Sequence, residues 1–312
     1  MSATGSDAAA HPSHAPQHPS VTYLVEHTTT YLYSEPVAVC HNEIHLVPRG
    51  LPRQRVLANT VHVQPDPVAL STHIDAFGNT VGYFSLQQPH EQLTVASTSR
   101  VEVVPPSPWQ QLPSHSWELL RDDLERSQTP EALHAKQFCF ESPLVRTLEP
   151  LAEWATDLFP PGRPWAEAVV DLTRRIHREF VYDPMATTIS TPVEDVFRLK
   201  RGVCQDFAHL EIACLRSLGL AARYVSGYIA NTRGASEPEL IGADASHAWL
   251  SVWGGDAGWL DLDPTNDCVP ATQHVVLGWG RDYADVCPIK GVYVGGGSHR
   301  MDVVVHVTAL DR

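Results

Sequence analysis

Short alternating runs of apolar and polar residues dominate the first third of the chain. β-Branched and aromatic residues recur over residues 21–104, and turn-forming residues separate the runs VTYLVEHTTTYLY, NTVHVQ, NTVGYFSL and LTVASTSRVEVV. Residues 75–79 lie between two such runs and predict a hairpin turn, because Gly78 or Asn79 can adopt a positive φ. Several short strands at this spacing predict a small all-β sandwich over residues 21–104.

The pattern changes after a proline-rich segment. The run VPPSPW at residues 104–109 contains three prolines, and proline cannot donate a hydrogen bond to a strand ladder. We therefore expect residues 105–130 to form an irregular linker. Beyond it, apolar residues recur every three or four positions, which predicts helices. These helices cover residues 143–159, 164–180, 192–199 and 204–218.

Alternation returns once Gly219 has ended the last helix. The pattern then predicts strands at residues 222–229, 247–253, 259–263, 275–279 and 301–307. Helices followed by strands indicate an α+β domain over residues 131–312, in which helices pack on an antiparallel sheet. The length of 312 residues is compatible with two domains.

Composition narrows the classes of partner. The chain has 36 acidic and 22 basic residues, a net charge of −14, and no basic cluster. A nucleic-acid partner is therefore not expected, because binding to phosphates needs concentrated lysine and arginine. No run approaches the roughly 20 apolar residues of a membrane span, so no membrane association is expected either. The sequence does not indicate an oligomeric state.

The N-terminus and the cysteines bear on the compartment. Residues 1–20 are rich in Ala, Ser, Pro and His, which predicts a disordered tail, and they lack the basic and apolar regions of a secretory signal. The six cysteines are dispersed without a CxxC pair. A domain of this size does not need disulfides, so we expect reduced thiols in the cytoplasm.

The clearest candidate for chemistry is Cys204. In the run KRGVCQDFAHL, a glycine-containing turn delivers this cysteine to the first turn of an apolar helix. Unpaired amides and the helix dipole at that position favour a thiolate over a thiol. The alternative is a buried structural cysteine, which Cys214 exemplifies in the middle of the same helix.

A thiol nucleophile also needs a base and a group that orients the base. His247 begins a predicted strand, and Asp263 ends the next one at a proline-fixed turn. If the two strands are neighbours, Asp263 can reach the ring nitrogen of His247 that faces away from the thiol. Taken singly, a structural histidine and a turn-forming aspartate are the alternatives. The ordered trio Cys204, His247 and Asp263 is more specific than any of its members.

These residues lie in segments that resemble a known family. RGVCQDFAHLEIACLRSLGLAARYVSGYI, SHAWLSVW and GWLDLDPTND resemble the core of the transglutaminase-like superfamily. YLVEHTTTYLYSEPV, HLVPR and DAFGN resemble the N-terminal β-domain of its bacterial group, and GRDYADVCPIKGVYVGG is similar to that group as well. The resemblance covers roughly residues 21–310 and implies a papain-like α+β scaffold with the chain order Cys, His, Asp.

The resemblance also implies roles for residues. Cys204 is similar to the family's nucleophile, His247 to its general base and acid, and Asp263 to the residue that orients the histidine. Asp261 lies on the same strand face as Asp263, but Asp263 occupies the Asp-Pro-Thr position of the family motif. Besides the Cys204 N–H, candidate donors to the oxyanion are Tyr182 and the side chain of Gln205, with core packing as the alternative for Tyr182.

The function expected from these features is thiol-dependent acyl transfer. We expect a cysteine peptidase or amidase that cleaves peptide, isopeptide or amide bonds of a protein or peptide substrate through a thioester. One alternative is a protein-glutamine gamma-glutamyltransferase, and another is a catalytically silent protein-binding scaffold. No acidic loop has calcium-ligand spacing, so neither a metal nor a cofactor is expected. The aromatic set Trp249, Trp253, Trp259 and Trp279 could build a cleft, although at least half should fill the core. Arg223 could anchor a carboxylate inside the protein, with a role in binding substrate as the alternative.

Overall fold

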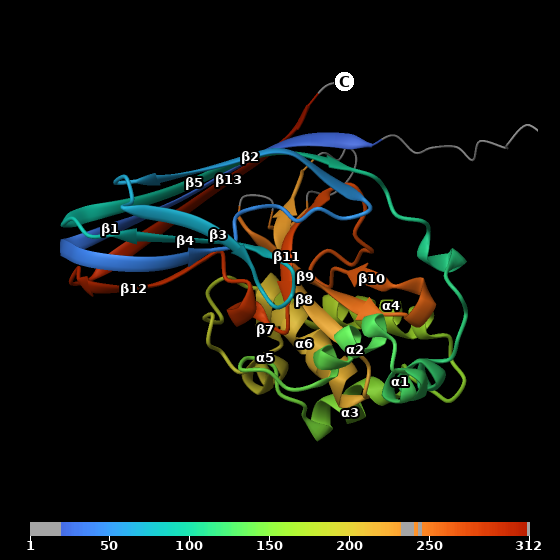
Figure 1. Ribbon diagram of the computed structural model, residues 1–312. Helices are drawn as coiled ribbons and strands as arrows, with labels where there is room; N and C mark the ends of the chain where they lie inside the picture. The colour runs from blue at the N-terminus through green and yellow to red at the C-terminus, as the bar shows by residue number, and fades with distance from the viewer. Residues whose placement is uncertain (1–19, 232–239, 243–244, 311–312) are drawn as a thin grey trace, which may run out of the picture.

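The structure is a computed structural model that describes residues 20–231, 240–242 and 245–310 (Figure 1). The predicted tail at residues 1–20 lies outside the described residues except for Ser20. Within the described ranges, none of the helices combines the length and the apolar composition that a bilayer span requires.

Five strands from the first third of the chain form most of the larger sheet. They are β1 (Val21–Ile44), β2 (Gln54–Gln64), β3 (Ala69–Ile74), β4 (Thr80–Leu86) and β5 (His90–Val103), in the order β2-β5-β1-β4-β3. Gly78 has a φ of 79° in the turn between β3 and β4, which confirms the predicted hairpin.

The end of the chain returns to this sheet. β13 (His299–Leu310) pairs with the first half of β1, and β12 (Ile289–Gly295) pairs with its second half, which completes a seven-stranded sheet. The sheet curls around a core that includes Val37, Phe84 and Leu93. In Figure 1 it extends to the left of the helices, so the N-terminal β part contains strands from both ends of the chain.

The predicted irregular linker is wrong in its second half. Residues 105–116 contain only a short 3-10 turn, but α1 (Trp117–Arg126) follows, and α2 (Pro130–Lys136) comes next. Ser116 caps α1 by accepting a hydrogen bond from the Leu119 N–H. Leu120 and Leu124 are buried on its inner face. Their spacing of four residues was a helical signal within a segment that the prolines dominated.

Of the four helices predicted after residue 140, only the first differs from the structure by more than one residue at either end. α3 (Glu149–Thr156) is shorter than the predicted helix at 143–159, because Ser142 and Val145 pair in an isolated bridge before it. The other three, α4 (Trp165–Glu179), α5 (Val193–Leu199) and α6 (Cys204–Ser217), begin and end within one residue of their predicted bounds.

The smaller antiparallel sheet has the order β10-β9-β8-β11. Its strands are β8 (Ala222–Ile229), β9 (His247–Trp253), β10 (Trp259–Leu262) and β11 (His274–Gly280). Ala248, Leu250 and Val252 face a core shared with α4 and α6. Trp249 belongs to a separate core with Trp279 on the opposite face. The predicted α+β class, with helices packed on an antiparallel sheet, is confirmed.

Candidate active site

The turn before α6 holds Cys204 in place. β6 (Val181–Tyr182) and β7 (Arg201–Gly202) pair as a short parallel ladder immediately before Cys204. The Asp206 carboxylate accepts hydrogen bonds from the Val203 N–H (2.8 Å) and the Thr187 hydroxyl (2.6 Å). Cys204 is the first residue of α6, so its own N–H has no acceptor within the helix. This N–H and the thiol belong to the same half-buried helix end.

His247 is the first residue of β9, and it is fully buried. Its Nε2 lies 2.9 Å from Asp263 Oδ2. Burial lowers the pKa of His247, but the charge of Asp263, the charge of Cys204 and hydrogen bonding to both raise it to about 10. Nδ1 makes no hydrogen bond of regular geometry. The contact with the thiol is therefore looser than the contact with the carboxylate, as is common in active sites without substrate.

The Asp263 carboxylate accepts five hydrogen bonds. Oδ2 accepts from His247 Nε2, His274 Nε2 (3.1 Å) and Asn266 Nδ2 (2.8 Å), and Oδ1 accepts from the backbone N–H groups of Thr265 (3.0 Å) and Asn266 (3.2 Å). Burial alone would raise the pKa of Asp263, but the two histidines hold it well below its usual range. The buried carboxylate is therefore ionised and fixed in orientation.

The structure brings Asp263, and not Asp261, to His247. Asp261 pairs with Ser251 across β10 and β9, and its carboxylate accepts a hydrogen bond from the Ser251 hydroxyl. It also lies 3.4 Å from the Arg53 guanidinium. Strand alternation alone could not separate the two aspartates, because the turn at Pro264 redirects the second of them toward the histidines.

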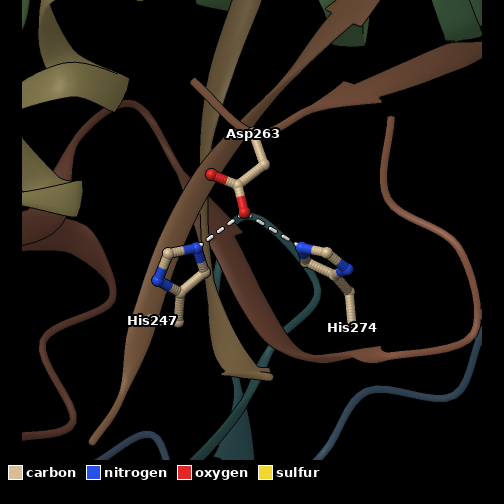
Figure 2. A group of neighbouring side chains, drawn as sticks. All are labelled: His247, Asp263 and His274. Atoms are coloured by element: carbon tan, nitrogen blue, oxygen red, sulfur yellow. Dashed lines mark hydrogen bonds and ion pairs between the residues drawn. The ribbon is translucent and has the colours of Figure 1, made fainter. Parts of the chain in front are cut away.

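His274 is a member of this group that the sequence did not reveal. It begins β11, packs edge-on against Trp249 with ring centroids 5.1 Å apart, and shares Oδ2 of Asp263 with His247 (Figure 2). Burial lowers its pKa although Asp263 opposes this, so a neutral ring donates Nε2–H to the carboxylate. Seventeen histidines occur in the chain, and no local motif distinguishes this one.

The two histidines and Asp263 also present three atoms of the kind that bind metals, all within 4.8 Å of one another. Both ring nitrogens point at the same carboxylate oxygen, at 2.9 and 3.1 Å, and not at a common point between three ligands (Figure 2). Bonds to zinc are about 2.0–2.2 Å long. The donor set therefore fits a hydrogen-bonded carboxylate better than a metal centre.

The two candidate oxyanion donors differ in their surroundings. Tyr182 pairs with Gly202 and makes no hydrogen bond through its hydroxyl within the described part of the chain, and burial together with the charge of Cys204 raises its pKa. Gln205 donates its side-chain N–H to the Ile189 carbonyl (3.1 Å). The side chain of Gln205 is thus engaged by the loop that precedes α5, whereas the Tyr182 hydroxyl has no such partner among the described residues.

We expect Phe in place of His274 to slow the alkylation of Cys204 by iodoacetamide about tenfold, because losing one charged hydrogen bond costs about 1.5–3 kcal/mol and leaves Asp263 less firmly placed. His274→Gln should recover part of the rate, since its amide can donate to Oδ2. Rates at pH 6 for both variants, with thermal unfolding curves beside them, check this. Equal rates for the Phe and Gln variants would contradict a role in positioning Asp263.

Gly242 lies against the free side of the His247 ring. Its φ is +97°, and a Cβ placed there would lie 2.7 Å from His247 Nδ1. Such a contact must displace the ring or the backbone beside it. The space next to Nδ1 therefore depends on the absence of a side chain at this position.

For Gly242→Ala we expect about a tenfold slower alkylation of Cys204 at pH 6, because small displacements of a catalytic group are costly. Gly258→Ala is the matched control: φ is +74° there as well, but a Cβ at Gly258 meets nothing within 4 Å. Both variants carry backbone strain, but only Gly242→Ala places a methyl group against the His247 ring. If both slow the reaction equally, strain and not contact with His247 is responsible.

Glu211 is a buried acid on the inner face of α6. Oε1 accepts a hydrogen bond from the Thr173 hydroxyl (2.7 Å), and Oε2 has no partner in the described structure. Burial raises the pKa of Glu211 to about 8, the Thr173 hydrogen bond lowers it, and the charge of Asp263 raises it further. Glu211 is therefore mostly protonated at neutral pH.

The folded pKa of Glu211 is above its value of 4.5 in the absence of burial, so the folded state binds the proton more tightly and stability falls as pH rises from about 4.5 through 8. Glu211→Gln should remove this loss. We expect the variant to gain in melting temperature relative to the wild type between pH 6 and pH 9. Glu167→Gln, on the exposed side of α4, is the control, and a gain that does not depend on pH would contradict the assignment.

Two family models and several relatives match the chain. The model of the bacterial transglutaminase-like N-terminal region matches residues 23–102, and the model of the transglutaminase-like superfamily matches residues 152–264. An uncharacterized protein of Mycobacterium tuberculosis is 41% identical over 297 residues, which are 93% of each chain. A protein-glutamine gamma-glutamyltransferase of Pseudomonas aeruginosa is 29% identical over 144 residues, which cover 40% of this chain and 22% of that protein.

A solved structure is similar over nearly the whole chain. A protein of Cytophaga hutchinsonii described as a candidate cysteine protease superposes with a TM-score of 0.76 and 20% identity, over 95% of this chain and 93% of its own. At this level of identity the likeness concerns the fold.

Proposed function

Because the chain belongs to the transglutaminase-like superfamily, we propose that it is a thiol-dependent acyl-transfer enzyme with Cys204, His247 and Asp263 as its triad. The observation that carries the proposal is the contact of His247 with both partners. Its Nε2 donates to Asp263, and the Cys204 thiol interacts with the same ring. Nδ1 then takes the thiol proton, and the raised pKa of His247 keeps it on the ring as an imidazolium beside the thiolate.

The reaction follows from this arrangement. His247 takes the proton of Cys204, and the thiolate attacks the carbonyl carbon of an amide. The N–H of Cys204 and the hydroxyl of Tyr182 stabilise the oxyanion, and removal of one such donor typically costs about 3 kcal/mol. The imidazolium then gives its proton to the leaving amine, and a thioester on Cys204 remains.

We propose hydrolysis as the second half-reaction, which makes the protein a cysteine peptidase or amidase that acts on a protein or peptide. Water is always available to hydrolyse the thioester, whereas transfer to an amine requires a dedicated binding site for the acceptor amine. The name of the Pseudomonas aeruginosa relative favours the second candidate, a protein-glutamine gamma-glutamyltransferase. The two activities share every step up to the thioester.

A glutamine-containing peptide incubated with a fluorescent primary amine separates the candidates. Release of ammonia or of a peptide amine without incorporation of the fluorescent amine is the expected result. Covalent incorporation would establish the transferase. Cys204→Ala should abolish either product, and Cys139→Ala, at a half-buried thiol whose pKa burial raises to about 11, should leave it unchanged. If product formation survives Cys204→Ala, the thiol mechanism is wrong.

We propose a cytoplasmic location. All six cysteines are free thiols, and a reducing compartment keeps thiols in that state. Trapping of thiols in intact cells with a membrane-permeant maleimide should modify the protein, whereas an impermeant maleimide should not.

A further inference from the structure

A cavity that the proposed triad does not line is found on the smaller sheet. Its volume is about 370 Å³, and it lies between the segment Leu51–Arg53 and the strands β8, β9, β10 and β11. Arg223, Ser251 and Asp261 occupy paired positions on the same face of three adjacent strands and line it together. Ser251 is four residues along β9 from His247, about 13 Å. None of the proposed triad residues lines this cavity.

Arg223 is the unusual group in the cavity. Only 6% of the residue is exposed, and its guanidinium stacks between Trp259 (4.0 Å) and Trp279 (3.6 Å). Within the described residues it forms no ion pair and no hydrogen bond, and its Nε is buried without a partner. The sequence-based expectation that Arg223 anchors a carboxylate of the protein is therefore wrong.

Asp261 does not neutralise Arg223. Asp261 affects Arg223 electrostatically, but its carboxylate is engaged by Ser251 and Arg53. Burial lowers the pKa of Arg223 to about 9, so the group is still a cation at neutral pH. A buried cation without hydrogen-bond acceptors is costly, and a ligand that supplies them would recover that cost.

The shape of the cavity limits the ligand. A guanidinium presents its N–H donors in a planar fork that matches a carboxylate. The side chains of Leu51 and Val276 suit an apolar body. Guanidiniums of Arg223 and Arg49 cover Trp279 at 3.6 Å each, so its indole offers only an edge to the cavity. About 300–1,000 Å³ is the usual volume of small-molecule sites, which often lie between domains. We propose that this cavity binds a small organic carboxylate whose oxygens pair with Arg223 and whose apolar part lies against Leu51 and Val276.

Benzoate and its neutral isostere benzamide provide the test, which does not depend on the proposed enzyme activity. Titration of each into the Cys204→Ala protein, followed by tryptophan fluorescence and calorimetry, excludes reaction at the thiol. We expect benzoate to bind at least tenfold more tightly than benzamide. If benzoate, hexanoate and acetate all bind no better than their amides, the proposal is overturned.

Two substitutions locate the binding. Arg223→Met should abolish the preference for benzoate, and Arg55→Met should keep it, because Arg55 is an exposed arginine paired with Glu102 outside the cavity. Arg223→Lys keeps the charge but not the planar fork, so it should lose part of the preference for benzoate. It serves as the test if Arg223→Met fails to fold. A preference for benzoate that survives both substitutions of Arg223 would place the carboxylate elsewhere and overturn the proposal.

Discussion

Replacing His247 by alanine is expected to slow the alkylation of Cys204 by iodoacetamide at pH 6 by about 30-fold to 100-fold. The pKa of His247 is raised to about 10, so at pH 6 the ring holds a proton beside the sulfur and stabilises the thiolate. Without the ring, a cysteine of ordinary pKa, about 8.5, is less than about 1% thiolate at that pH.

The pH dependence gives the sharper form of this test. The imidazolium stays protonated up to about pH 10, so the alkylation rate of Cys204 in the wild type should exceed that in His247→Ala throughout pH 6 to 8. In His247→Ala it should rise almost tenfold per pH unit over the same range. His306→Ala, at an exposed histidine on β13, should behave like the wild type.

The other thiols provide an internal reference. Cys214 is fully buried, and burial raises the pKa of Cys139 to about 11. Cys287 donates its S–H to the Ile289 carbonyl. Peptide mapping after brief alkylation should therefore find Cys204 modified first. If Cys139 or Cys287 reacts as fast as Cys204, His247 does not activate the thiol.

The sequence predicted the residues that carry a local signal. Cys204 follows a glycine turn at a helix start, and Asp263 precedes a proline at a strand end, so backbone chemistry within a few residues positions both. The structure places the two close to the same histidine. The helices after residue 160 were predictable for the same reason, because their apolar spacing is local.

What the sequence could not predict depends on contacts between distant segments. β12 and β13 join β1 from 245 or more residues away, and no local pattern selects that partner. His274 acquires its role only because β11 lies beside β8 and faces Asp263. The isolated cation of Arg223 likewise depends on Trp279, which comes from another strand of the sheet.

Replacing Asp263 by asparagine is expected to reduce peptide turnover by about 10³-fold to 10⁴-fold, although the side chain keeps its shape. All five partners of the carboxylate are donors. An amide NH₂ must therefore face donors whichever way it is turned. Where it faces His247, Nε2 becomes the acceptor and the ring proton moves to Nδ1, which can then no longer take the proton of Cys204.

The same change should lower stability, because it removes a buried charge on which several donors depend, at a cost of about 3 kcal/mol. Asp261→Asn is the matched control: it lies two residues earlier on the same strand, yet it contacts Ser251 and Arg53 and not His247. We expect that variant to keep turnover within about threefold of the wild type, since changes away from a reacting group are usually small. Turnover and melting temperature measured for both variants decide which aspartate orients the histidine, and a larger loss of turnover in Asp261→Asn would reverse the assignment.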